Sequence, residues 1–254
     1  MTETPSSAFA AMAANDAAPP PLDRARDALF LDFDGTLAPL QDDPDTVWLP
    51  TGGDYTLQAL SQALDGALAV VSGRDIRDLD RRIPGALWRA GGHGCDICAP
   101  GRHPSAWQPP APDPLYQAAY ALAAETQGAR LESKGPILAI HYRANRTAGP
   151  DLGAALAAMV ADHPSYALQA GKCVYELKPA GASKARAVER LMAIPAFAGR
   201  RPVMIGDDVT DEDGMRAAIG LAGRAIKVGP GDSLATARLE NPAHVWTWLE
   251  AQLP

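Results

Sequence analysis

The feature that most restricts the fold of this chain is a repeated alternation of short apolar runs with segments of helical periodicity. Helical patterns over 55–64 and from Asp75 onward alternate with the first of these runs. The largely apolar runs are ALFLDF (28–33), ALAVV (67–71), PVMIGDD (202–208) and RAIKVG (224–229). Apolar strands separated by helices are typical of a parallel sheet covered on both faces. We therefore expect an α/β fold with a Rossmann-like parallel sheet at its core.

A different order of elements interrupts this alternation in the middle of the chain. The pattern there predicts an α-β-β-α-β-β order, over 115–126, 129–132, 137–142, 152–161, 166–169 and 173–177. Such an order suits a small sheet with helices on one face. Pro- and Gly-rich junctions at 104–114 and 178–181 flank the segment, and domain boundaries commonly fall in such stretches. We therefore expect an inserted α/β cap domain.

These junctions divide the chain into three predicted parts. We expect a core made of residues 27–106 and 180–254, a cap domain of residues 107–179, and a flexible Ala- and Pro-rich leader over residues 1–26. A length of 254 residues with 47% hydrophobic content is enough to bury a sizeable core.

The charge balance argues against several classes of partner. The formal net charge is −7, whereas nucleic-acid binding needs clustered Lys and Arg. No apolar stretch reaches the roughly 18–20 residues of a membrane span, and no secretory signal pattern opens the chain. Three cysteines give no even disulfide framework. We therefore expect a cytoplasmic protein, monomeric by default, with neither nucleic acid nor membrane as its partner.

Cys95 and Cys98 form a C-x-x-C pair, with His93 and His103 nearby in the sequence. The pattern leaves a zinc or redox site open, but no second pair of cysteines follows it. We expect small buried thiols at these positions instead.

We expect functional residues directly after the predicted strands, because ligands of parallel α/β sheets bind outside the carboxyl ends of the strands. In LFLDFDGTL (29–37), strand alternation directs Asp32 and Asp34 to the same side, and Gly35 permits a sharp turn afterwards. In VVSGR (70–74), the hydroxyl of Ser72 and the amides of the following turn suit an anion.

Two later segments bring a lysine and a run of acids to the same edge. Lys184 opens a predicted helix, and five acids lie within 207–213, directly after an apolar strand. Acids at this density repel one another unless a cation is bound, and oxygen ligands of this number suit Mg²⁺. Each feature alone also fits a structural role, as a solvated lysine or an acidic helix start. Their joint occurrence favours a site for a phosphate and a metal.

Four motifs, DFDGTL, SGR, Lys184 and GDDVTDED, resemble in this order the signature motifs of the haloacid-dehalogenase-like phosphatases. The insert between the second and third motifs looks like the cap of the sugar-phosphatase branch of that superfamily. Ala185 departs from the usual Gly after the lysine, and the leader matches nothing in the family. The resemblance narrows to the trehalose-6-phosphate phosphatase family through GGHG (91–94), E-x-K (132–134), HYR (141–143) and YELKPAGASK (175–184), and it covers roughly residues 27–250.

The resemblance implies a role for each catalytic motif residue. Asp32 would be the nucleophile that forms an aspartyl-phosphate. Asp34 would protonate the leaving sugar oxygen and then deprotonate the attacking water. Ser72 and Lys184 would hold the phosphoryl oxygens and offset the charge that develops on them.

The resemblance also implies ligands for a magnesium ion. Asp207 would bind Mg²⁺ directly, together with Asp32 and the backbone carbonyl of Asp34. Asp208 and Asp211 would complete or support this shell.

Substrate choice would come mostly from the cap, since the core contacts only the phosphate. A site that pairs the hydroxyls of a disaccharide rejects analogues that leave its polar groups unsatisfied. The same residues would otherwise form a surface ion-pair cluster. The candidates are Glu132, Lys134 and Glu176 on predicted cap strands, His93, Gly94 and Arg143 with weaker support, and Gly73 and Arg74 after the second motif.

The function implied by the resemblance is Mg²⁺-dependent hydrolysis of trehalose 6-phosphate, a phosphorylated disaccharide, to trehalose and phosphate. A related phosphatase acting on sucrose phosphate or mannosyl-3-phosphoglycerate is the nearest alternative. A sugar phosphomutase on the same scaffold and a non-catalytic phosphosugar sensor are more distant ones.

Overall fold

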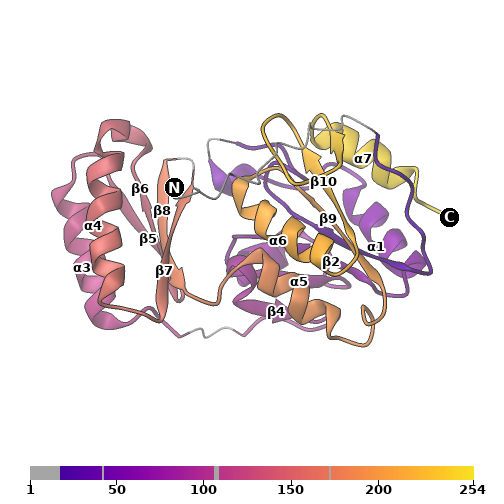
Figure 1. The fold of residues 1–254 in the computed structure, drawn as a ribbon, viewed down its shortest axis with the longest axis horizontal. Coiled ribbons are helices and arrows are strands. Elements are labelled where there is room, and N and C mark those ends of the chain that lie inside the picture. Colours follow the sequence, from indigo (N-terminus) through magenta and orange to yellow (C-terminus); the bar gives the residue numbers. More distant parts are fainter. Residues whose placement is uncertain (1–17, 42, 106–108, 172) are drawn as a thin grey trace, which may run out of the picture.

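The apolar runs form a seven-stranded sheet in the computed structural model, which describes residues 18–41, 43–105, 109–171 and 173–254 (Figure 1). The strand order is β11-β10-β9-β1-β2-β3-β4. Every residue of β1 and β2 is buried, which explains why both strands are apolar on both faces apart from Asp27 at the start of β1. The strands are β1 (Asp27–Leu31), β2 (Leu68–Val71), β3 (Trp88–Gly91), β4 (Asp96–Cys98), β9 (Arg201–Gly206), β10 (Arg224–Val228) and β11 (Ala237–Leu239).

The predicted parallel sheet is confirmed for six of these strands, and β4 differs by pairing antiparallel with β3. The connection between β3 and β4 is the short 3-10 turn Gly92–Gly94. A connection of this length cannot make the crossover that a parallel neighbour requires. The sequence pattern did not predict β4 or β11.

Five helices pack on the large sheet: α1 (Gly53–Ala63), α2 (Ile76–Arg82), α5 (Lys184–Met192), α6 (Val209–Gly220) and α7 (Pro242–Glu250). Polar side chains cap the starts of α2, α5, α6 and α7, because the first amides of a helix lack partners within it. The Ser183 hydroxyl accepts a hydrogen bond from the Arg186 amide ahead of α5, and Asn241 caps α7 in the same way. The sequence pattern did not predict α7.

A second sheet and a second hydrophobic core form in the middle of the chain. Its strands pair antiparallel in the order β5-β6-β8-β7. Figure 1 shows α3 and α4 on the face of this sheet that is turned away from the seven-stranded unit. The order of elements is the predicted one, with α3 (Asp113–Glu125), β5 (Arg130–Lys134), β6 (Ile137–His141), α4 (Gly149–Ala161), β7 (Tyr166–Gly171) and β8 (Val174–Pro179).

The predicted leader falls outside the described residues as far as residue 17. Its remainder contacts the end of the chain: the Pro19 carbonyl accepts a hydrogen bond from the Trp248 indole, and the Leu22 amide donates to Gln252. Among the described residues, no helix is both long and apolar enough to cross a membrane.

Candidate active site

Four motif segments meet at the carboxyl edge of the large sheet. Leu31 pairs with Ile205 at the ends of β1 and β9, so Asp32 and Asp207 follow neighbouring strand ends. Lys184, the first residue of α5, is buried, and its Nζ lies 2.6 Å from Asp32 Oδ1 and 2.5 Å from Asp211 Oδ1. The structure therefore brings together the nucleophile candidate, the lysine and the acid run that the sequence pattern had predicted to share one edge.

Three carboxylates crowd this edge, since ligand oxygens of Asp32, Asp207 and Asp211 lie within 4.8 Å of one another. Burial, reinforced by the charge of Asp211, raises the pKa of Asp32 well above its ordinary value and that of Asp207 to about 6. Burial opposes the charge on Lys184, but the charges of Asp211 and Asp32 raise the pKa of this lysine above its ordinary range. Lys184 hydrogen-bonds to two of these carboxylates, and the charges of Lys184 and Lys227 partly offset the rise in the pKa of Asp207.

The aspartate group is chemically suited to a divalent cation. Asp207 Oδ1 is buried and has no hydrogen-bond partner among the described residues, and a buried polar atom of this kind is costly without a ligand. Carboxylate oxygens are the ligands that Mg²⁺ prefers. Gly35, at φ +85°, makes room for this carboxylate, because a Cβ there would collide with the side chain of Asp207.

Asp208 and Asp211 also stabilise the start of α6. Asp211 Oδ2 accepts hydrogen bonds from the backbone amides of Asp207 and Asp208, and the Asp208 carboxylate caps the helix. Asp208 is exposed and lies outside the group of three carboxylates. The acid run thus combines the two interpretations that the sequence left open, a cluster suited to a metal and an acidic helix start.

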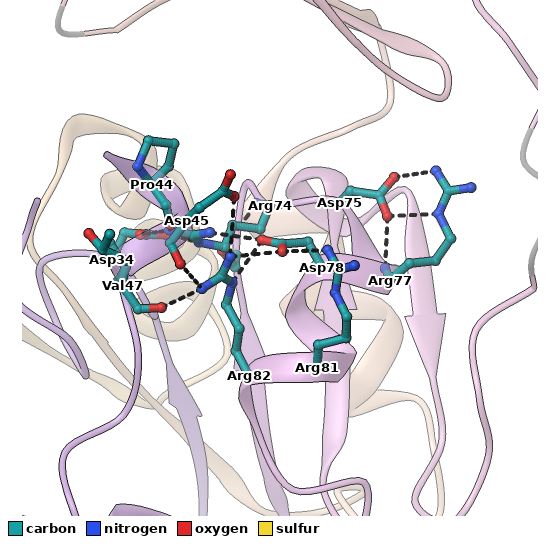
Figure 2. A network of polar contacts seen from close by, with 12 residues as sticks. Asp34, Pro44, Asp45, Val47, Arg74, Asp75, Arg77, Asp78, Arg81 and Arg82 are labelled. Carbon is teal, nitrogen blue, oxygen red and sulfur yellow. Dashed lines mark hydrogen bonds and ion pairs between the residues drawn. The ribbon is translucent and has the colours of Figure 1, made fainter. Parts of the chain in front are cut away.

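Asp34 points to Arg74 and lies outside that group of three carboxylates. The guanidinium of Arg74, expected from the sequence at a phosphate or sugar, forms two hydrogen bonds with this carboxylate (Figure 2). Burial lowers the pKa of Arg74, but the hydrogen bonds and charges of Asp34 and Asp78 outweigh it and raise the pKa above its ordinary range.

Ser72, Gly73 and His93 pack against one another just after the end of β2. The Ser72 hydroxyl is buried and accepts a hydrogen bond from the Arg74 amide at 3.1 Å. The backbone carbonyl of Ser72 accepts one from the His93 amide at 3.0 Å. A Cβ on Gly73 would lie 2.7 Å from Cε1 of the His93 ring. The close approach of this imidazole therefore requires glycine at position 73.

The cap candidates gather around Glu176, which lies on β8. Its Oε2 is 2.8 Å from His93 Nε2, and its Oε1 is 3.9 Å from Lys134 Nζ. Lys134 is 3.7 Å from Glu132, which also contacts His141 at 2.7 Å. Ala139 pairs with Glu132 on one side and Glu176 on the other, so both carboxylates share one face of the small sheet.

His93 Nε2 donates a hydrogen bond to the Glu176 carboxylate, which can only accept. Burial lowers the pKa of His93, and its Nδ1 has no partner among the residues that the structure describes. Burial disfavours the Glu176 carboxylate, but the hydrogen bond from His93 and the charges of His93, Lys134 and Lys178 lower its pKa to about 2.

Two further candidates lie in turns of the chain. Gly94 turns the chain at φ +87°, and its carbonyl accepts a hydrogen bond from Arg190 at 2.8 Å. Arg143 is exposed in the 3-10 segment Arg143–Ala148 after β6.

Sequence reasoning missed two buried lysines beside the site. Lys227 on β10 donates to the backbone carbonyl of Asp207, and Lys178 on β8 donates to Gln169 while its charge acts on Glu176. A lysine inside the apolar run RAIKVG was a signal, because a buried charge needs a specific partner. Lys178 lies within YELKP and carried no comparable signal.

Cys95 is half-buried and Cys98 buried, and both are free thiols whose pKa is raised by burial. Cys98 Sγ accepts from Arg89 at 3.3 Å. Within the described ranges, no group of three metal-ligating side chains contains either cysteine. The placement of Cys98 agrees with the expected buried thiol.

Comparisons with known proteins place this geometry in a family context. A family model described as trehalose-phosphatase matches residues 30–219. A curated relative named trehalose-6-phosphate phosphatase, from Escherichia coli K12, is 39% identical over 230 residues, covering 89% of this chain and 86% of the relative.

Two solved structures share the fold. The C-terminal domain of Candida albicans trehalose-6-phosphate phosphatase superposes with a TM-score of 0.77 at 22% identity, over 92% of this chain and 98% of that one. A haloacid dehalogenase-like hydrolase from Bacteroides thetaiotaomicron gives a TM-score of 0.64 at 15% identity, over 89% and 99% of the two chains. At these identities the likeness concerns the fold alone, and it confirms the expected haloacid-dehalogenase-like α/β architecture.

Proposed function

The chain belongs to the trehalose-phosphatase family, and from this membership we propose that it hydrolyses trehalose 6-phosphate to trehalose and inorganic phosphate. We propose that this phosphoric monoester hydrolase depends on Mg²⁺ and forms an aspartyl-phosphate. The observation that carries the proposal is the buried ammonium of Lys184, 2.6 Å from Asp32 and beside two further aspartates. A nucleophile, a cation for phosphoryl oxygens and oxygen ligands for a metal are thus available at one edge.

In the proposed first step, a carboxylate oxygen of Asp32 attacks phosphorus, and the bond from phosphorus to the sugar oxygen breaks. The phosphoryl group is then carried by Asp32 as an acyl phosphate. Protonated Asp34 gives its proton to the leaving sugar oxygen, and the carboxylate so formed later takes one from the water that hydrolyses the acyl phosphate. Two moderate barriers replace one high barrier.

Ser72 and Lys184 are the proposed ligands of the non-bridging phosphoryl oxygens. Both side chains are buried, and fixed donors in a site shielded from water stabilise developing charge more strongly than donors in solution. Lys184 is already held between two carboxylates, so its ammonium needs little reorganisation when phosphate arrives.

We propose that Asp32, Asp207 and the carbonyl of Asp34 would hold Mg²⁺, with Asp211 and Asp208 supporting them. The uncompensated carboxylate charge and the unpartnered Asp207 Oδ1 support this assignment. When bound, the ion supplies positive charge that draws phosphate to the nucleophile and offsets charge in the transition state.

The sugar would be recognised by Glu132, Lys134 and Glu176, together with His93. These side chains contact one another and come from both the large-sheet and the small-sheet units. Their donors and acceptors suit the hydroxyls of a disaccharide. We propose that residues 107–179 act as a cap that closes on the core and excludes water. Gly73, Arg74, Gly94 and Arg143 complete the proposed substrate-binding region.

A phosphate-release assay over a panel of sugar phosphates tests this function. The panel contains trehalose 6-phosphate, sucrose 6-phosphate, mannosyl-3-phosphoglycerate and glucose 6-phosphate, each with Mg²⁺ and with a chelator. We expect Mg²⁺-dependent release with a preference for trehalose 6-phosphate on the order of 10² or more in kcat/KM. Equal rates on all substrates, isomerised product without free phosphate, or binding without turnover would each contradict the proposal.

We further propose that the protein acts as a cytoplasmic monomer. Light scattering on the purified protein tests the oligomeric state: the mass of one chain is expected, and a stable dimer mass would contradict it. Fractionation of cells tests the compartment.

A further inference from the structure

Arg74 binds the carboxylate of Asp34 through two parallel hydrogen bonds. Its Nε donates to Oδ2 at 2.7 Å, and its Nη2 donates to Oδ1 at 2.6 Å. This fork geometry fixes both the position and the plane of a carboxylate, which a lysine ammonium cannot do. The partners are 40 residues apart in the chain, on the loop after β1 and the turn before α2.

Arg74 is itself held in place by several other groups. Its Nη1 donates to Asp78 at 2.8 Å, and its Nη2 also donates to the Pro44 carbonyl at 2.9 Å. The guanidinium lies 5.4 Å from the centre of the Phe33 ring. The arginine side chain is only 10% exposed, so its fork has little freedom to turn.

Asp78 extends this support into α2. It accepts hydrogen bonds from Arg82 Nε at 2.9 Å and from Arg81 at 3.0 Å, and Arg82 Nη1 donates to the Val47 carbonyl at 2.5 Å. Figure 2 shows these contacts as one continuous network from Asp34 to Val47, with the Arg77–Asp75 pair beside it. The network connects the loop after β1 to α2.

A direct contact between Arg74 and substrate fits this geometry less well. Four of the five N–H groups of the guanidinium already donate to acceptors among the described residues, which leaves one N–H, on Nη1, for a substrate oxygen. Asp34, in contrast, keeps 29% of its side chain exposed. The exposed partner of the pair is therefore the carboxylate, and the arginine lies behind it.

We propose that Arg74 is a positioning residue that acts through Asp34. It holds the carboxyl group at one place and orientation, from which protonated Asp34 gives its proton to the sugar oxygen and the resulting carboxylate then takes one from water. Misplacement of a catalytic group by about 1 Å can cost on the order of 10² in rate. The inference rests on the proposed proton-transfer role of Asp34, and it replaces a direct substrate contact of Arg74 with an indirect role through Asp34.

A double-mutant cycle tests the inference on the full-length protein with trehalose 6-phosphate and Mg²⁺. The variants are Arg74→Gln, Asp34→Asn and the double variant, with Arg77→Gln as a matched control. Arg77 lies three residues further along, in the first turn of α2, and forms a comparable bidentate pair with Asp75. Arg74→Lys keeps the buried charge but not the fork, and it replaces the glutamine variant if that one fails to fold.

We expect Arg74→Gln to lower kcat about 10- to 100-fold with little change in KM, and Arg77→Gln to leave kcat unchanged. Asp34→Asn should cost about 10²- to 10⁴-fold, and adding Arg74→Gln to it should cost less than about 3-fold more. Multiplicative losses, a change confined to KM, or an Arg74 variant as active as the control would overturn the inference. Full activity of Asp34→Asn would instead refute the proposed role of Asp34.

Discussion

The imidazole of His93 lies 2.8 Å from the carboxylate of Glu176, although His93 follows β3 of the large sheet and Glu176 belongs to β8 of the small one. The contact joins the two units at a point where candidate sugar-binding groups from both of them meet. The low pKa of Glu176, about 2, keeps this carboxylate ionised as an acceptor for hydroxyl groups at neutral pH.

Replacing Glu176 with glutamine should impair only substrates that carry the sugar. A hydrogen bond to a charged group contributes about 1.5–3 kcal/mol, so we expect kcat/KM for trehalose 6-phosphate to fall about 10- to 100-fold. Hydrolysis of p-nitrophenyl phosphate, which offers no sugar hydroxyls, should stay within about twofold. The control is Glu125→Gln, at the exposed end of α3. An equal loss with both substrates would argue against sugar recognition by Glu176.

The same residue should make stability depend on pH in a defined direction. The pKa of Glu176 is lowered on folding to about 2, so its stabilising contribution is present above the ordinary glutamate pKa near 4.5 and is lost as pH falls toward 2. The free energy of unfolding of wild type minus that of Glu176→Gln should therefore shrink between pH 6 and pH 3. Urea unfolding at several pH values measures this difference, and a constant gap would contradict the assignment.

Gly73→Ala should disturb His93, because the new Cβ would lie 2.7 Å from the imidazole Cε1. Overpacking of this kind costs about 1–3 kcal/mol, and the displaced ring should loosen its contact with Glu176. Urea unfolding and kcat/KM for trehalose 6-phosphate measure the two effects. Gly220→Ala is the matched control, because a Cβ there meets no atom within 4 Å. Wild-type stability and activity in Gly73→Ala would show that the packing constraint is absent.

Magnesium should stabilise the protein through Asp207. Ligands that bind only the folded state raise the free energy of unfolding, by about 2.7 kcal/mol at one hundred times the dissociation constant. We expect the melting temperature to rise with Mg²⁺ in the wild type and to stay unchanged in Asp207→Asn, while Asp213→Asn on the same acid run keeps the response. Asp213 is outside the group of three carboxylates and pairs with Arg216. Equal responses in all three proteins would place the ion elsewhere.

Much of the fold follows from the sequence because the buried strands carry a strong local signal. The runs that became β1, β2, β9 and β10 are apolar throughout or nearly so, and the helices between them leave a parallel arrangement as the stable solution. The antiparallel β4 was not foreseen, because its pairing depends on a short turn after β3 instead of on strand composition.

Residue types at the site were predictable, but several of their partners were not. Asp32 and Lys184 were expected at one edge, and they meet there. The pairing of Asp34 with Arg74 depends on how α2 packs beside the loop after β1, which no local pattern encodes. The contact of His93 with Glu176 likewise depends on how the small sheet lies against the large one.

The most direct test of the account is the rate of phosphate release from trehalose 6-phosphate with Mg²⁺, measured for wild type and for a folded Asp32→Asn variant. The asparagine keeps the shape of the side chain but removes the carboxylate that would carry the phosphoryl group. We expect turnover by the wild type and a loss on the order of 10⁴-fold or more in the variant. Turnover by Asp32→Asn at a wild-type rate, or no phosphate release by the wild-type protein, would contradict the account.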